Sequence, residues 1–121
     1  MSISNVLVVD DSRTEQMFIV SLLQKNGMHV ATADNADAAM AQLQVQKPDL
    51  ILMDVVMPGK NGFQLTRQLS KDPAYADVPI IMCTSMNQET DMVWGMRQGA
   101  RAYVTKPINP AELLTKIKEL G

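Results

Sequence analysis

The chain has 121 residues, 46% of them hydrophobic, which fits one domain with a genuine core and excludes a disordered polypeptide. A formal net charge of -2, with no run of Lys or Arg, argues against a nucleic-acid-binding protein. Residues 1–9 are too short and too polar for a signal peptide, so none is expected. The single cysteine cannot form an internal disulfide, and no apolar run approaches the roughly 18 residues of a membrane helix. We therefore expect residues 1–121 to form one cytoplasmic, monomeric domain without membrane insertion.

The N-terminal third predicts a strand, a helix and a second strand. Residues 6–9 are all apolar and form the first strand. Ser12, with Glu15 three residues later, indicates a capping box at the start of a helix, and Gly27 is its expected C-terminal cap. Residues 29–33 form the second strand. The helical residues expected to face the core are Met17, Val20, Leu22 and Leu23.

The middle of the chain predicts a helix, a strand and another helix. The second helix covers residues 36–45. The apolar run of residues 50–53 leads straight into Asp54 and a cluster of turn-forming residues, which is typical of a strand buried on both faces of a parallel sheet. A third helix runs from about Phe63 to Lys71. The residues of the second helix expected to face inward are Ala39, Met40 and Leu43.

The C-terminal part predicts two more strand–helix units. After a loop with two prolines, residues 80–83 form the fourth strand and residues 88–98 the fourth helix. Residues 102–105 form the fifth strand. Asn109 caps the last helix, with Pro110 at its first position. The residues of this helix expected to face the core are Leu113, Leu114, Ile117 and Leu120.

Five strands that alternate with five helices imply an α/β fold in which a parallel sheet is covered on both faces. Because crossovers between parallel strands are right-handed, only a few doubly wound topologies remain. The chain contains no internal repeat, linker or second domain.

Polar residues follow four of these strands at the point where each strand ends. They are Asp10, Asp11, Asp54, Thr84 and Lys106. Each alone could be a helix cap or a strand residue, but together they meet at the sheet edge where open α/β folds bind ligands. Three carboxylates at one place repel one another and suit Mg²⁺. Asp54 would be the nucleophile for a phosphoryl group, Lys106 would neutralise the transferring oxygens, and Thr84 would donate a hydrogen bond.

The chain resembles a response-regulator receiver domain of the single-domain chemotaxis type. The matching motifs are VVDDS at residues 8–12, MDVVMPGKNG at 53–62, CTS at 83–85 and GARAYVTKP at 99–107. They span essentially the whole chain in the order and spacing of the family. The resemblance implies a flavodoxin-like sheet of five parallel strands in the order 2-1-3-4-5, with five helices.

The resemblance also implies a role for each residue of the constellation. Asp54 is the phosphoacceptor, Thr84 and Lys106 bind the phosphoryl group, and Tyr103 is the aromatic residue that turns inward when the switch is on. A strand tyrosine can also be half-buried packing alone. The bond between Lys106 and Pro107 is expected to be cis. The implied Mg²⁺ ligands are Asp10, Asp11, Asp54 and the backbone carbonyl of Val56.

Residues 88–100, QETDMVWGMRQGA, resemble regulators of type IV pilus twitching systems. The family usually has a polar residue where Trp94 stands. Two interpretations stay open: Trp94 is partly exposed beside Met92 as a docking patch, or it packs locally. Cys83 is expected to be a buried small hydrophobe and not a redox sensor, and His29 a surface residue of the second strand.

The expected function is a stand-alone phospho-switch that takes a phosphoryl group from a histidine kinase or phosphotransfer domain. No output domain is expected, because residue 121 ends the last helix, so the output is protein binding, in pilus or chemotaxis-type motility, or consumption of phosphate as a sink. No enzyme activity is expected beyond self-dephosphorylation, which Val56 and Met86 would slow.

Two rival classes remain. An aspartyl-nucleophile phosphohydrolase would carry a second acid two residues after the first, where this chain has Val56. A degenerate receiver that only binds partners would not need the five polar residues at the strand ends.

Overall fold

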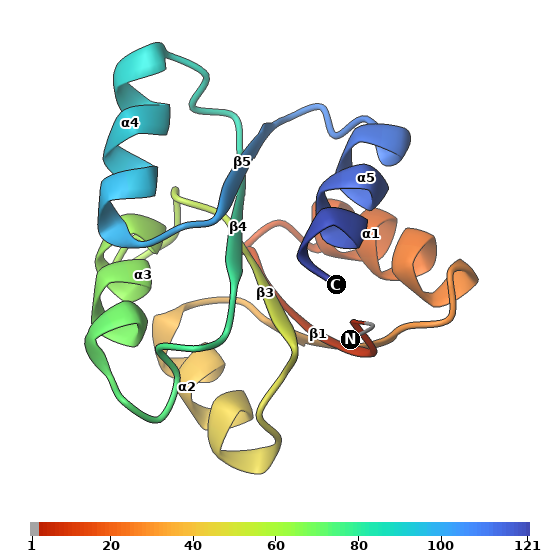
Figure 1. Cartoon of the computed structure of the whole chain (residues 1–121), viewed down its shortest axis with the longest axis horizontal. Helices are drawn as coiled ribbons and strands as arrows, with labels where there is room; N and C mark the ends of the chain where they lie inside the picture. The colour runs from red at the N-terminus through yellow and green to blue at the C-terminus, as the bar shows by residue number, and fades with distance from the viewer. Residues whose placement is uncertain (1–2) are drawn as a thin grey trace.

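The computed structural model describes residues 3–121 as a parallel sheet between two layers of helices (Figure 1). The strands are β1 (Asn5–Val9), β2 (His29–Ala33), β3 (Leu50–Met53), β4 (Ile80–Thr84) and β5 (Ala102–Thr105). The helices are α1 (Arg13–Lys25), α2 (Ala36–Val45), α3 (Gly62–Lys71), α4 (Glu89–Gln98) and α5 (Pro110–Leu120). The strand order is β2-β1-β3-β4-β5, and every pair is parallel, which confirms the predicted topology.

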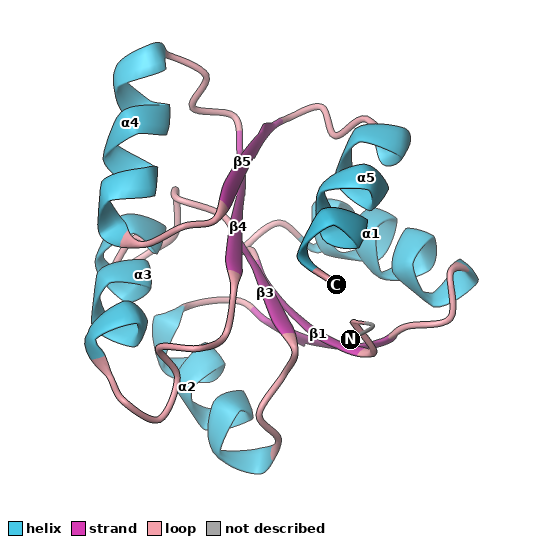
Figure 2. Cartoon of the chain, viewed as in Figure 1, coloured by secondary structure: helices cyan, strands magenta, loops and turns pink. Residues whose placement is uncertain are grey.

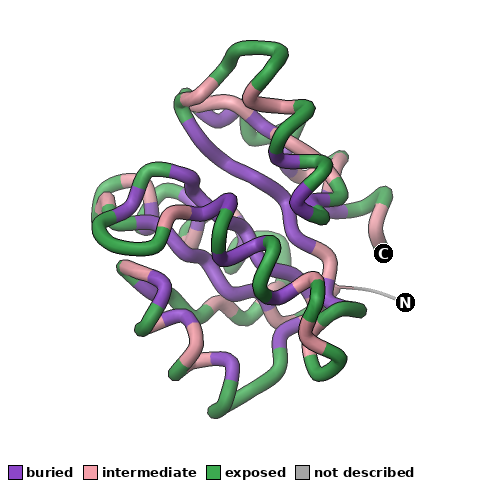
Figure 3. Tube along the Cα trace, turned by 90° about the vertical axis from the view of Figure 1, so that its left-hand side faces the viewer, coloured by how far each residue is buried: buried purple, intermediate pink, exposed green. Residues whose placement is uncertain are grey.

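The two layers of helices cover opposite faces of the sheet. Helices α2, α3 and α4 lie on one face, and α1 and α5 lie on the other (Figures 1 and 2). Successive strand residues point to opposite faces, so Leu7 and Val9 pack under the first layer, whereas Val6 and Val8 pack under the second. The central strands are therefore buried along their length (Figure 3), as their apolar runs predicted.

The buried face of α1 differs from the predicted one. Met17 was expected to face inward, but it is 59% exposed, and the buried residues are Gln16, Ile19 and Leu23. The helix carries apolar residues on both sides, so periodicity alone did not identify the buried one. Asn26 is the C-cap, and Gly27 follows it with a left-handed φ of 82°, which confirms the prediction that this glycine ends the helix.

The remaining boundaries differ little from the prediction. Thr84 belongs to β4 instead of following it. The Lys106–Pro107 peptide bond is cis, as the family resemblance implied. Among the helices of residues 3–121, none has the length and apolar character needed to span a membrane.

Candidate functional site

The acidic residues meet at the carboxyl edge of the sheet because their strands are adjacent and parallel. Asp10 directly follows β1, and Asp54 directly follows β3. Their backbone N–H groups extend the ladder: Asp10 donates to the Ala33 carbonyl at 3.0 Å and Asp54 to the Val9 carbonyl at 2.9 Å. Asp10 and Asp54 are buried, whereas Asp11 is exposed. One carboxylate oxygen from each of the three residues lies within 4.8 Å of the other two.

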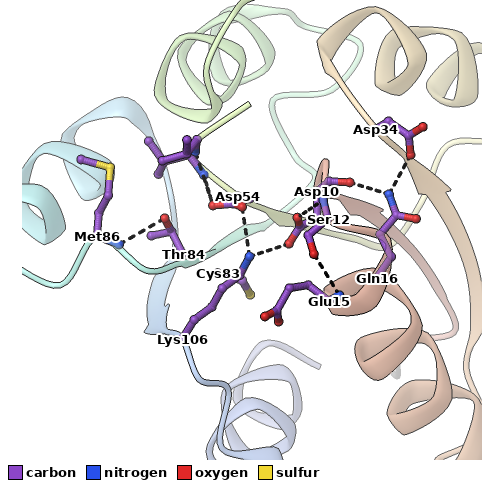
Figure 4. A network of polar contacts seen from close by, with 12 residues as sticks. Asp10, Ser12, Glu15, Gln16, Asp34, Asp54, Cys83, Thr84, Met86 and Lys106 are labelled. Carbon is purple, nitrogen blue, oxygen red and sulfur yellow. Dashed lines mark hydrogen bonds and ion pairs between the residues drawn. The ribbon is translucent and has the colours of Figure 1, made fainter. Parts of the chain in front are cut away.

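Lys106 reaches this cluster from the loop after β5. Its Nζ lies 2.8 Å from Asp10 Oδ2 and 3.0 Å from Asp54 Oδ2, so one ammonium group bridges two buried carboxylates (Figure 4). Both ion pairs are largely removed from water, with the lysine side chain only 12% exposed. Three carboxylates face a single lysine here, so the cluster carries more negative than positive charge.

The ionisation of the site follows from this burial and pairing. Burial raises the pKa of Asp10 above its usual range, and its hydrogen bonds from Lys106 and the Ser12 N–H only partly oppose this effect. Burial alone would lower the pKa of Lys106, but its hydrogen bonds to Asp10 and Asp54 outweigh burial and raise it. Lys106 is therefore positively charged at neutral pH.

Local backbone structure sets the direction of both buried carboxylates. Asp10 Oδ1 accepts the Ser12 N–H at 2.8 Å, and the Ser12 hydroxyl caps α1 by accepting the Glu15 N–H at 3.3 Å. Asp54 Oδ1 accepts the Val55 N–H at 2.7 Å. The loop after Asp54 then passes so close to Gly62 that a Cβ there would lie 2.0 Å from the Asp54 carbonyl oxygen. Because glycine has no Cβ, it is the only residue that fits at position 62.

The donor set of the acidic cluster fits a hard divalent cation. The converging groups are carboxylate oxygens, which Mg²⁺ prefers, and their excess negative charge needs a further cation. Asp11 is open to solvent, so an ion bound there would keep water ligands, as Mg²⁺ usually does.

Thr84 and Tyr103 are joined through the loop after β4. Thr84 is fully buried, and its Oγ1 accepts the Met86 N–H at 3.3 Å. The Tyr103 hydroxyl donates to the Met86 carbonyl at 2.7 Å. Burial raises the pKa of Tyr103 to about 12, so the phenol remains a donor at neutral pH. Its ring lies over Gly95, where a Cβ would come within 3.1 Å of it.

Gln16 is the part of the site that the sequence analysis missed. It is buried on α1, and its amide nitrogen donates to the Asp10 carbonyl and, at 2.8 Å, to Asp34 Oδ1 (Figure 4). A polar residue among the apolar residues of an amphipathic helix, five positions after the second aspartate of a pair, is the signal that could have identified it.

Cys83 and His29 lie as predicted, and neither belongs to the site. Cys83 is buried in β4, and burial raises the pKa of its thiol to about 12. His29 is exposed on β2.

Trp94 is 50% exposed, beside the exposed Val93 and Met96, which agrees with the partly exposed interpretation.

The buried thiol yields a direct prediction. In the folded protein at pH 8, Cys83 should react with iodoacetamide at least about a hundredfold more slowly than in 6 M guanidinium chloride, because the thiolate is the nucleophile and is nearly absent below a pKa of about 12. Mass spectrometry of timed samples measures both rates. Comparable rates in the two states would show that the thiol is accessible and not a core residue.

Comparisons with known proteins agree with this geometry. The family model described as response regulator receiver domain matches residues 6–118. Protein PilH of Pseudomonas aeruginosa is 49% identical over 114 residues, which cover 94% of this chain and 94% of PilH. The phosphate regulon transcriptional regulatory protein PhoB of Escherichia coli is 37% identical over 113 residues, which cover 93% of this chain and 49% of PhoB.

The fold is also similar to solved structures of a chemotaxis protein and a response regulator. The chemotaxis protein CheY4 of Vibrio cholerae superposes with a TM-score of 0.91 at 31% identity, covering 99% of this chain and 100% of that one. A response regulator from Chloroflexus aurantiacus superposes with a TM-score of 0.93 at 28% identity, covering 98% of both chains.

Proposed function

Because the chain belongs to the response regulator receiver family of two-component signalling, we propose that Asp54 is its phosphoacceptor and that phosphorylation there switches binding to a protein partner. The phosphoryl donor is a phosphohistidine of a histidine kinase or phosphotransfer protein. The observation that carries the proposal is the buried Asp54 carboxylate, held beside the Lys106 ammonium and within a cluster of three acids.

The transfer step uses groups that are already in place. A carboxylate oxygen of Asp54 attacks phosphorus, an acyl phosphate bond forms, the P–N bond of the donor breaks, and its electron pair returns to the imidazole. Lys106 Nζ, 3.0 Å from Asp54 Oδ2, lies close enough to neutralise the oxygens of the incoming group. The Thr84 hydroxyl can accept the Met86 N–H and still donate its own proton to a phosphoryl oxygen.

We propose that Mg²⁺ is the resident cation, held by Asp10, Asp11 and Asp54 and by the backbone carbonyl of Val56. When bound, the ion neutralises negative charge on the transferring oxygens. The protein's own contribution is to present the carboxylates together. Ser12 and Lys106 orient Asp10, whereas the Val55 N–H orients Asp54.

The same contacts suggest how the switch reaches the surface. If Thr84 turns toward a phosphoryl group on Asp54, its contact with Met86 changes, and Met86 also accepts the Tyr103 hydroxyl. Tyr103 packs against Gly95 of α4, so α4 and β5 form the responding face. The exposed apolar residues of α4, including Trp94, are then candidates for partner contact.

This coupling predicts where the protein responds to a phosphoryl mimic, and it is the experiment that tests the proposed function. Adding beryllofluoride to ¹⁵N-labelled protein that is already saturated with Mg²⁺ should shift amide resonances of residues 92–101 and of Tyr103, as well as those around Asp54. Two-dimensional NMR spectra measure the shifts, and Asp54→Asn is the control that should show none. Shifts confined to the neighbourhood of Asp54 would contradict the switch, and no shifts at all would contradict the phosphoacceptor.

The lifetime of the phosphorylated state depends on two residues beside the attacking water. Val56, two residues after Asp54, is 58% exposed, and Met86, two residues after Thr84, is partly buried. Neither side chain can orient a water for in-line attack, so we expect self-dephosphorylation to be slow.

Replacing Val56 with Asn and Met86 with Glu should therefore speed the decay of phospho-Asp54 by about tenfold, which corresponds to a barrier lower by about 1.4 kcal/mol. The decay is followed by intact mass without kinase or phosphatase. A parent that decays within seconds, or a double variant that decays no faster, would show that these residues have no kinetic role.

The pathway is proposed from similarity alone. The resemblance of residues 88–100 to twitching regulators and the similarity to PilH, over nearly the full length of both chains, support a role in type IV pilus motility. We propose that the protein acts in the cytoplasm as a monomer. A phosphate sink is the alternative output, and a slow self-dephosphorylation would disfavour it unless a phosphatase assists.

A further inference from the structure

The side chain of Gln16 links two loops beside the acidic cluster. Gln16 lies in the first turn of α1 and is only 6% exposed. An amide nitrogen carries two hydrogens, and here there is an acceptor for each. The two nearer acceptors are the backbone carbonyl of Asp10, at the end of β1, and the Asp34 carboxylate, 2.8 Å away in the loop between β2 and α2. The Ala33 carbonyl is a third, longer contact at 3.4 Å.

Asp11 differs from Asp10 in how its side chain is held. Asp10 is oriented by the Ser12 N–H and by Lys106, whereas no hydrogen bond or ion pair within residues 3–121 involves the Asp11 side chain. The Asp10 carbonyl and the Asp11 nitrogen belong to the same planar peptide group. A hydrogen bond from Gln16 to that carbonyl therefore fixes the direction from which the Asp11 side chain leaves the backbone.

We propose that Gln16 is a positioning residue that holds Asp11 in the arrangement that binds the divalent cation. This inference rests on the proposed function, since it presumes that Asp10, Asp11 and Asp54 bind Mg²⁺. Gln16 itself does not contact the ion. It acts through the Asp10–Asp11 peptide, with Asp34 as the second acceptor that keeps its amide oriented (Figure 4).

The test is a calorimetric titration of the purified protein with MgCl₂. Gln16→Met keeps the length of the side chain and removes every hydrogen bond that the amide donates. We expect the dissociation constant for Mg²⁺ to rise about tenfold, as for other residues that support metal ligands. Gln24→Met, on the exposed side of the same helix, is the matched control and should bind like the parent. A Gln16→Met variant with the parent's dissociation constant would overturn the proposal.

A second arm separates positioning from general loss of stability. Ile19→Val also removes a buried contact of α1, and it should lower the thermal midpoint in EDTA without changing Mg²⁺ affinity. If Ile19→Val weakens Mg²⁺ binding as much as Gln16→Met, Gln16 is structural only and the proposal is wrong.

A third arm uses the exposed Asp34, where substitution leaves the core intact. Asp34→Asn and Asp34→Ala remove the same charge, but only Asn keeps the acceptor for Gln16. We expect Asp34→Ala to bind Mg²⁺ about threefold more weakly than Asp34→Asn, the size of one modest hydrogen bond. Equal affinities would contradict the role of Asp34. A parent that binds no Mg²⁺, or Asp11→Ala that binds like the parent, would instead contradict the proposed function.

Discussion

Replacement of Asp54 by asparagine should abolish phosphorylation of the protein by acetyl phosphate in the presence of Mg²⁺. Asparagine keeps the shape of the side chain and an oxygen that can accept the Val55 N–H, so the loop after β3 is retained. The amide is not a nucleophile toward phosphorus, so no acyl phosphate can form. Intact-mass spectrometry should therefore show one added phosphoryl group on the parent and none on the variant.

The control for this experiment is an aspartate outside the site. Asp37 is exposed in the first turn of α2, so Asp37→Asn should be phosphorylated to the same extent as the parent. Asp54→Asn should remain folded, because removing one of three clustered carboxylates reduces their repulsion. Equal labelling of Asp54→Asn and the parent would eliminate Asp54 as the phosphoacceptor.

Replacement of Lys106 by methionine should have the largest effect on stability. Methionine is similar in length but leaves Asp10 and Asp54 buried without their shared cation. Breaking a buried ion pair by removing one partner costs about 3 kcal/mol or more, since the remaining charge loses its compensation. We expect a loss of about 3 kcal/mol in the free energy of unfolding in EDTA, measured by urea denaturation at pH 7.5.

Mg²⁺ should restore part of that stability, because a cation that binds only the folded state stabilises it by mass action. Lys118→Met is the matched control: this exposed lysine lies on α5, and its loss should change stability by less than about 0.5 kcal/mol. If Lys106→Met unfolds in EDTA at the same urea concentration as the parent, the bridge in Figure 4 does not contribute to stability.

The positions of the acidic residues and of Lys106 could be predicted because they depend on strand ends. Short apolar runs such as residues 50–53 locate the strands, and parallel pairing brings their carboxyl ends to one edge. Which charges pair could not be predicted in the same way. The bridge from Lys106 to Asp10 and Asp54 joins residues 96 and 52 positions apart, and it depends on the path of the loop after β5.

The role of Gln16 on helix α1 could not be predicted from the sequence pattern. Periodicity favoured Met17 as a buried residue because it counts apolar side chains and ignores hydrogen-bond acceptors on neighbouring loops. The buried side is instead set by Ile19 and Leu23, and Gln16 shares it because Asp10 and Asp34 satisfy its amide. A buried polar residue needs such partners, and only the folded arrangement brings them together.

The most direct test of the central claim is to locate the phosphoryl group that the protein accepts from a P–N bond. The parent is incubated with phosphoramidate, a small donor with the same bond as phosphohistidine, in Mg²⁺ or in EDTA. It is then reduced with borohydride to mark the acyl phosphate and digested for peptide sequencing by mass spectrometry. We predict a single modified residue, Asp54, with the modification present in Mg²⁺ and lost in EDTA. A modification on another residue, or one on Asp54 that is equally abundant in EDTA, would contradict this account.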